Sequence, residues 1–196
     1  LLGVTAGILA AVRKDRIPDF LLSALAVVGQ SMPSFWLGIL LIQLFALDLR
    51  WLPTSGMDGP LNLVLPTLTL AAFLLPNFIL ITRTAVLETV NELFVTTARS
   101  KGLREWSIMF RHILPNAINP VLSFLGLQMG RLVGGSIITE TIFAWPGIGS
   151  LMIRSIFQRD VPVVIAAVFI VSIAIVLANL LIDILQSWVD PRMRLD

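Results

Sequence analysis

Long apolar segments separated by short polar ones dominate this chain of 196 residues. A helix needs about 20 apolar residues to cross the hydrocarbon core of a bilayer, and four segments reach that length. A fifth is shorter and is predicted to be the second half of a helix. None alternates apolar and polar positions as a membrane-spanning strand would. The pattern therefore predicts an all-α integral membrane protein with about five spans, at residues 1–12, 20–47, 61–82, 120–139 and 161–189.

Prolines predict where two of these helices depart from regular geometry. Pro33 lies near the middle of residues 20–47. It removes a backbone N–H and so predicts a kink whose freed carbonyl needs polar neighbours. Pro66 and Pro76 are expected to interrupt residues 61–82 in the same way.

Small residues at four-residue spacing allow helix backbones to approach each other closely. Gly3 and Gly7 have this spacing, although chance placement is an equally good interpretation. Gly126, Gly130 and Gly134 repeat it in the fourth span. Packing within the subunit is the first interpretation of that stripe, and an interface with a second subunit is the alternative.

Composition excludes several other classes of protein. Hydrophobic residues make up 57% and charged residues 13%, with a net charge of only +2, which argues against nucleic-acid binding. There is no cysteine, so disulfides and thiolate metal sites are excluded, and no metal site is expected. The chain begins at Leu1, without Met and inside an apolar segment, which indicates a piece of a longer protein.

Positive charge indicates how the helices are oriented. If the spans alternate, residues 13–19, residues 83–119 and the C-terminus share one side, which holds ten of the fourteen Lys and Arg residues. The other side holds three, and one more lies within a span. The positive-inside rule then places residues 83–119 and the C-terminus in the cytoplasm.

The first half of residues 83–119 has the pattern of a short helix with an apolar face. The recurring positions are Val86, Leu87, Val90, Leu93, Phe94, Thr97 and Ala98. Arg99 and Lys101 precede Gly102, and cations in the last turn followed by glycine are typical of a helix end. A hinge is therefore predicted at residues 101–103.

The second half predicts another helix with its own apolar face. Its positions are Trp106, Met109, Phe110 and Ile113. Pro115 is expected to end this helix, and Asn119 with Pro120 to begin the next span. A basic pair of helices of this kind is predicted to be a docking element, with a hairpin lying on the membrane surface as the alternative.

One family resembles this segment closely. Its spacing of Ala98, Gly102, Leu114 and Pro115 resembles the EAA loop of ABC importer permeases. Thr96 and Thr97 replace the usual Glu and Ala, and His112 replaces Ile. Residues 97–103, TARSKGL, resemble instead the dipeptide, oligopeptide, nickel and glutathione branch, as do residues 33–36, 51–53, 140–147 and 190–192.

The resemblance implies a fold and a set of partners. The fold is that of a type I (MetI-like) ABC importer permease. Residues 1–196 would form a single transmembrane domain lacking its first helix and an external segment, with a cytoplasmic coupling loop at residues 83–119. The implied partners are two ATP-binding subunits, a second, different permease subunit and an extracytoplasmic solute-binding protein, in a bacterial or archaeal cytoplasmic membrane.

The resemblance also assigns roles to residues. The ATPase-coupling set would be Thr97, Ala98, Lys101, Gly102 and Leu103. No G-x4-G-K-[ST] motif is present, so ATP and Mg would bind only to partner subunits. No catalytic residue and no cofactor of this chain are expected, and it is not predicted to be an enzyme. The expected cargo is a peptide or a nickel or other metal chelate.

Other candidates lie outside the loop. Gln128 and Arg131, within a span, are candidates for the translocation path, with pairing or snorkelling as the alternative. Trp145, Arg154 and Arg159 are candidates for contact with the binding protein, on a segment that also fits a plain membrane-surface helix. Asn179, Asp183 and Gln186 form a polar stripe interpreted as interhelical hydrogen bonding. The alternative function is a transporter or channel not driven by ATP, with residues 83–119 as a regulatory hairpin.

Overall fold

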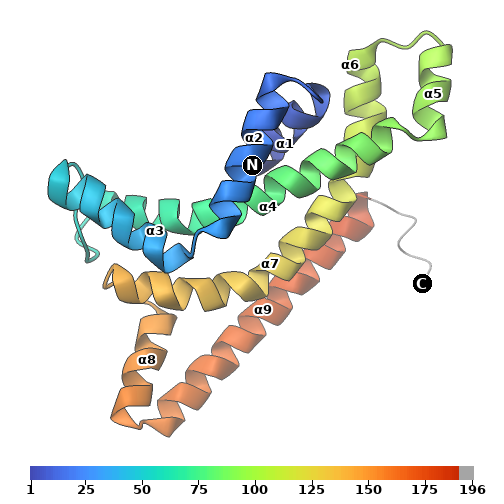
Figure 1. Cartoon of the computed structure of the whole chain (residues 1–196). Helices are drawn as coiled ribbons and strands as arrows, with labels where there is room; N and C mark the ends of the chain where they lie inside the picture. The colour runs from blue at the N-terminus through green and yellow to red at the C-terminus, as the bar shows by residue number, and fades with distance from the viewer. Residues whose placement is uncertain (190–196) are drawn as a thin grey trace. The chain divides into compact units, whose positions relative to one another are not determined.

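The computed structural model describes residues 1–189, except the side chains of residues 131, 133–135 and 189. Most of the described residues are in helices, and no strand occurs among them (Figure 1). Residues 190–192, which the sequence matched to the family, lie outside the described part. The α-helices are α1 (Leu2–Val12), α2 (Ile17–Ser31), α3 (Ser34–Leu41), α4 (Val64–Val90), α5 (Leu93–Ser100), α6 (Glu105–Ile108), α7 (Leu114–Ile142), α8 (Ile148–Gln158) and α9 (Val161–Val189). Two π-helical turns, η1 (Ile42–Asp48) and η3 (Met109–Ile113), and a 3₁₀ turn, η2 (Pro60–Leu63), complete the set.

Two helices of the described chain are long and apolar enough to cross a membrane, namely Pro60–Val90 and Val161–Trp188. A third is added if α2 and the α3–η1 segment are counted as one broken span. The break falls at Met32 and Pro33 as predicted, because Pro33 is extended, with φ −62° and ψ 133°, and precedes the first turn of α3. α1 is a shorter apolar helix, and α7 is 29 residues long.

The prolines of α4 and α7 do not interrupt those helices, contrary to the sequence prediction. α4 continues through Pro76 and past residue 82 to Val90. α7 runs from Leu114 through Pro115 and Pro120 without a new start. Each proline frees one carbonyl and crowds the preceding turn. Before Pro115 the π-helical turn η3 widens the helix, which relieves that crowding.

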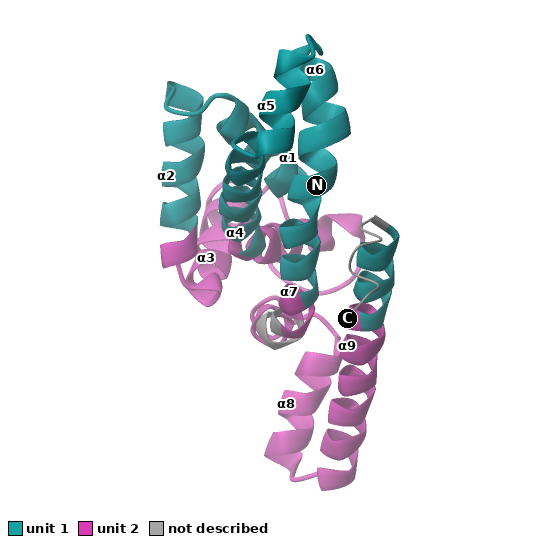
Figure 2. Ribbon diagram, turned by 90° about the vertical axis from the view of Figure 1, so that its right-hand side faces the viewer, with its two compact units in different colours: residues 1–29, 74–126, 180–196 teal, residues 30–73, 127–179 magenta. Residues whose placement is uncertain are grey.

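The chain folds as two compact units, each with its own core (Figure 2). The first comprises Leu1–Gly29, Leu74–Gly126 and Leu180–Asp196, and the second comprises Gln30–Phe73 and Leu127–Asn179. The core of the second unit gathers Ala46, Leu65 and Phe143, with partly buried side chains around them, among them Leu41 and Phe45. The core of the first unit lies under the α5–α6 hairpin and is described with it below.

In the first unit, α1 packs directly on the backbone of α4 through two glycines. A Cβ atom added at Gly3 would lie 2.7 Å from the Cβ of Phe78. At Gly7 it would lie 2.6 Å from the Cβ of Thr82 and 2.7 Å from the carbonyl oxygen of Ile79. Real Cβ atoms do not approach backbone atoms this closely. The interpretation of these glycines as a close helix contact is thus confirmed, and the chance placement is excluded.

Candidate functional site

The turn after α5 has the geometry that its glycine predicted. Gly102 has a φ of +75°, in the left-handed region, which glycine adopts without steric cost. The N–H of Leu103 donates to the carbonyl of Ala98 at 3.3 Å, and the N–H of Gly102 to that of Arg99 at 2.9 Å. These two bonds define a Schellman motif. The predicted hinge at residues 101–103 is therefore a well-defined turn between α5 and α6.

An ion pair between Arg99 and Glu105 links the end of α5 to the start of α6. Arg99 Nε lies 2.8 Å from Glu105 Oε1, and Arg99 Nη2 lies 3.2 Å from Oε2, so the guanidinium grips the carboxylate with two parallel bonds. Hydrogen bonding from Arg99 holds the pKa of the Glu105 carboxyl below its usual range, so both groups remain charged at neutral pH. Both side chains are well exposed. An exposed pair of this kind contributes little to stability.

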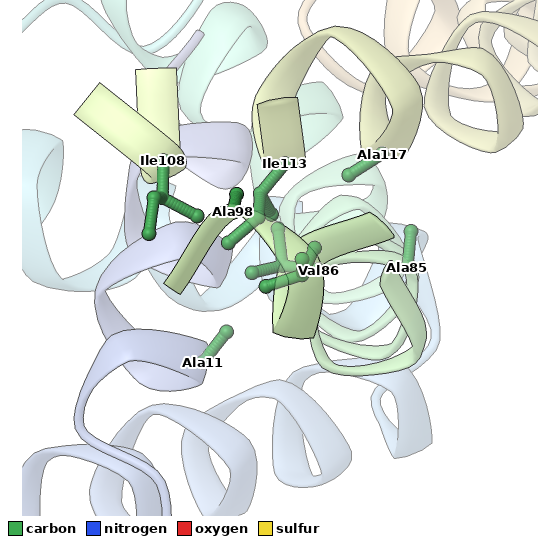
Figure 3. Packing of buried hydrophobic residues seen from close by; sticks show 8 residues of the cluster. Ala11, Ala85, Val86, Ala98, Ile108, Ile113 and Ala117 are labelled. Carbon is green, nitrogen blue, oxygen red and sulfur yellow. The ribbon is translucent and has the colours of Figure 1, made fainter. Parts of the chain in front are cut away.

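The inner face of the hairpin is anchored in the core of the first unit (Figure 3). Val95 and Ala98 of α5 and Ile108 of α6 are almost completely buried. They pack in one cluster with residues of three other helices and η3, namely Ala11, Ala85, Val86, Ile113 and Ala117. The hairpin is therefore joined by side-chain packing to the adjoining ends of α1, α4 and α7.

The predicted apolar face is confirmed for Val86, Leu87, Val90 and Ala98, which belong to the core cluster or pack against it, and is wrong for Leu93, Phe94 and Thr97. The expected face ran continuously from Val86 to Ala98 and included Leu93 and Phe94. The helix breaks after Val90, and α5 starts afresh at Leu93 with a different phase. Leu93 is 83% exposed and Phe94 is 41% exposed, whereas Val95, which the pattern omitted, is buried.

Four of the five predicted coupling residues lie together on the exposed side of the hairpin. Thr97, Lys101, Gly102 and Leu103 are exposed, and Leu103 retains 42% of its accessible surface. Ala98 is separated from them, because it is 6% exposed and faces the core. The hairpin thus combines a buried inner face with an exposed apex, the turn at residues 101–103, which carries the cation of Lys101 and the large apolar side chain of Leu103.

The candidate path residues lie on α7. Gln128 is only 1% exposed, and neither of its amide atoms has a hydrogen-bond partner among the described residues. The side chain of Arg131 lies outside the described residues. On α9, the Nε2 of Gln186 donates to the Oγ of Ser123 on α7 at 3.2 Å. For Gln186, this confirms the predicted interhelical hydrogen bond.

In the second unit, the predicted contact residues Trp145 and Arg154 line a groove of about 320 Å³ beside α8. Arg159 does not line it; it is exposed at the C-terminal end of α8, with a φ of +58°. The sequence missed Glu140, whose Oε2 accepts a hydrogen bond from the N–H of Ser150 at 2.9 Å. Gly149 packs against Ile137 of α7. Ten residues separate Glu140 from Ser150, so no helical spacing could have predicted the pair.

Glu140 is expected to stabilise α8, because a carboxylate at a helix N-terminus satisfies a free N–H and opposes the helix dipole. Replacing Glu140 by Ala should lower the free energy of unfolding by about 1 kcal/mol. Glu140→Gln keeps an acceptor and should lose less. Thermal unfolding of the detergent-solubilised protein measures both variants. An unchanged melting temperature for Glu140→Ala would contradict the capping role.

Comparison with known proteins agrees with this architecture. The model of the family described as "Binding-protein-dependent transport system inner membrane component" matches residues 3–195. The chain is 42% identical over 194 residues to the glutathione transport system permease protein GsiC of Escherichia coli strain K12. It is 43% identical, over the same length, to GsiC of Salmonella typhimurium strain LT2. The alignment covers 99% of this chain but 63% of each relative.

Solved structures show the fold. Two crystal forms of the MetNI methionine ABC transporter in inward-facing conformations superpose with TM-scores of 0.76 and 0.78. The sequence identity is 18%, over 96% of this chain and 86% of the compared chain. The chain therefore has the MetI-like ABC permease fold and belongs to the family of binding-protein-dependent transport system inner membrane components.

Proposed function

We propose that this chain is a permease subunit of an ATP-driven importer and that the apex of the α5–α6 hairpin docks on an ATPase subunit. The observation that carries the proposal is that α5 and the turn after it have both a buried side and an exposed side. Val95 and Ala98 hold α5 in the core, while Thr97, Lys101 and Leu103 are exposed beside them. A surface held in this way can bind a partner and pass its movement inward.

The mechanism proposed is alternating access. The excess of Lys and Arg at residues 83–119 favours a cytoplasmic hairpin, where two ATPases and a second permease subunit would complete the importer. Force applied at the apex would reach α1, α4 and α7 through the shared core. For ATP to drive the change, the ATPases must bind the two conformations of the hairpin with different affinity.

The proposed cargo is a peptide or peptide-like solute. The relatives that share 42–43% of the sequence are named for glutathione transport, and this favours a small peptide over a nickel chelate. A solute-binding protein would deliver it, and the groove with Trp145 and Arg154 is the proposed contact. Gln128 and Arg131 remain proposed residues of the path.

A matched pair of leucine variants tests the docking surface. Leu103, at the apex, is 42% exposed, and Leu49, after η1, is 39% exposed. In the complete transporter, Leu103→Asp should weaken retention of the ATPase about tenfold, because a desolvated apolar anchor is replaced by a charge. Leu49→Asp should retain it. Co-purification in mild detergent measures both.

Two outcomes would contradict the proposal. Equal retention of the ATPase by the two variants would remove the apex from the interface. A complete wild-type subunit that never co-purifies with an ATPase would favour the alternative, a transporter or channel not driven by ATP.

A further inference from the structure

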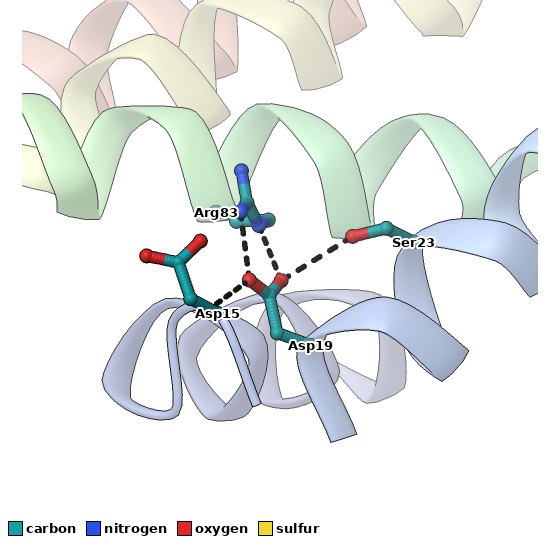
Figure 4. Close-up of polar contacts among 4 residues, drawn as sticks. All are labelled: Asp15, Asp19, Ser23 and Arg83. Carbon is teal, nitrogen blue, oxygen red and sulfur yellow. Dashed lines mark hydrogen bonds and ion pairs between the residues drawn. The ribbon is translucent and has the colours of Figure 1, made fainter. Parts of the chain in front are cut away.

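A partly buried ion pair joins the start of α2 to α4 in the first unit (Figure 4). Arg83 Nε lies 2.5 Å from Asp19 Oδ1, and Arg83 Nη2 lies 2.8 Å from Oδ2. The N–H of Asp15 and the hydroxyl of Ser23 donate to the same carboxylate, at 3.0 and 3.4 Å. Asp19 is only 4% exposed. Its carboxylate therefore accepts four hydrogen bonds, two of them from a guanidinium in the bidentate geometry.

Little else secures the first turns of α2. Asp19 and Ala26 are the two buried residues among the fifteen of this helix, all of which are described. Ile17 and Phe20, on either side of Asp19, are 76% and 73% exposed. A hollow of about 540 Å³ lies beside the pair and is lined by the same part of the chain. The position of the start of α2 is therefore set mainly by a directional polar contact and not by apolar packing.

On α4, Arg83 lies next to the residues that hold the α5–α6 hairpin in the core. Arg83 follows Thr82, against which Gly7 of α1 packs. It precedes Ala85 and Val86, which belong to the cluster that holds α5 and α6. One helical turn of α4 thus contacts α1, α2 and the hairpin.

Resting on the function proposed above, we infer that Asp19 and Arg83 are positioning residues of the transport cycle, which make α2 follow the movement of the α5–α6 hairpin. Apolar contacts are non-directional and let helices slide. A two-pronged guanidinium–carboxylate contact fixes both distance and orientation. Ion pairs withdrawn from water add little net stability compared with apolar packing, so the main effect of this pair is to fix geometry.

The first test uses the complete transporter in vesicles, with uptake and ATP hydrolysis measured together. Asp19→Asn and Arg83→Gln should lower the molecules transported per ATP about tenfold, which corresponds to about 1.4 kcal/mol of coupling. Arg83→Lys keeps the positive charge but cannot form the two parallel hydrogen bonds to Asp19. Its number of molecules transported per ATP should therefore fall between that of these two variants and that of wild type. Arg16→Gln, at an exposed arginine in the adjoining turn, should behave as wild type. An unchanged ratio in Asp19→Asn and Arg83→Gln would overturn the inference.

A covalent link gives the sharper test. These 196 residues contain no cysteine, so a bismaleimide can join Asp19→Cys to Arg83→Cys selectively once any cysteine elsewhere in the transporter has been replaced. The unlinked double variant should be uncoupled, and the linked one should recover most of the wild-type ratio. A link that stops transport while ATPase binding persists would show that α2 and α4 separate during the cycle, and would overturn the inference.

These outcomes are separable from failure of the proposed function. If wild-type complexes retain the ATPase and couple hydrolysis to uptake, only the role of the pair is at issue. If wild-type complexes never hold an ATPase, the proposed function fails first, and the inference fails with it.

Discussion

Replacing Gly102 by Val is expected to uncouple transport from ATP hydrolysis while leaving membrane insertion intact. No described atom lies within 4 Å of a Cβ added at Gly102, so the penalty comes from the backbone and not from a clash. At a φ of +75°, an L-residue costs about 1–2 kcal/mol, and a β-branched one is a particular outlier. The turn would relax to another conformation and give up the two Schellman hydrogen bonds. Uptake per ATP in reconstituted vesicles should fall about tenfold or more.

Gly102→Asn is the matched control for this prediction. Asn tolerates the left-handed region better than other side chains and replaces glycine at helix ends. Its coupling ratio should therefore stay near wild type. If Val and Asn were equally defective, the loss would come from the side chain on the docking surface, and the backbone explanation would be wrong.

Replacing Gly7 by Ala is expected to destabilise the first unit. The new Cβ would meet the backbone of α4 at Ile79 and Arg83 as well as the Cβ of Thr82, and backbone atoms cannot move aside without separating the helices. Overpacking of this kind costs about 1–3 kcal/mol, which outweighs the gain of about 1 kcal/mol in helix propensity. Thermal unfolding in detergent measures the change.

Gly130 on α7 provides the opposite case. It is exposed, and no described atom lies within 4 Å of its added Cβ. Gly130→Ala should therefore keep the propensity gain and raise the melting temperature slightly. If Gly7→Ala and Gly130→Ala shifted the melting temperature in the same direction, the close contact of α1 with α4 would not be the cause. The open surroundings of Gly130 also give no support, within the described residues, to packing of this glycine inside the subunit.

Local patterns in the sequence predicted the features that depend on one residue type. The helix end at Gly102, the break at Pro33 and the close approach at Gly3 and Gly7 follow from backbone geometry that only those residues impose or permit. The helical fold follows in the same way from the length of the apolar segments. The cytoplasmic side of the hairpin and the coupling roles of its residues stay predictions.

The errors and omissions have a different physical origin. Pro115 was expected to end one helix and Asn119 with Pro120 to begin the next, but the π turn η3 leads directly into α7, which continues through both prolines. The Asp19–Arg83 pair joins residues 64 positions apart. A contact at that separation leaves no periodic trace in a single sequence. It becomes visible only when the fold brings the two helices together.

The π-helical turn η3 sets the rotational phase between α6, the second arm of the hairpin, and α7, the helix that follows it. Residues five apart on an α-helix point about 140° away from each other. Ile108 and Ile113 are five apart, yet both are buried in the same cluster. The turn of η3 between them accommodates one more residue than an α-helical turn. One residue inserted into or deleted from the α6–η3 segment can therefore be absorbed by gaining or losing the π turn. The position of the apex can change in this way during evolution without rotating α7.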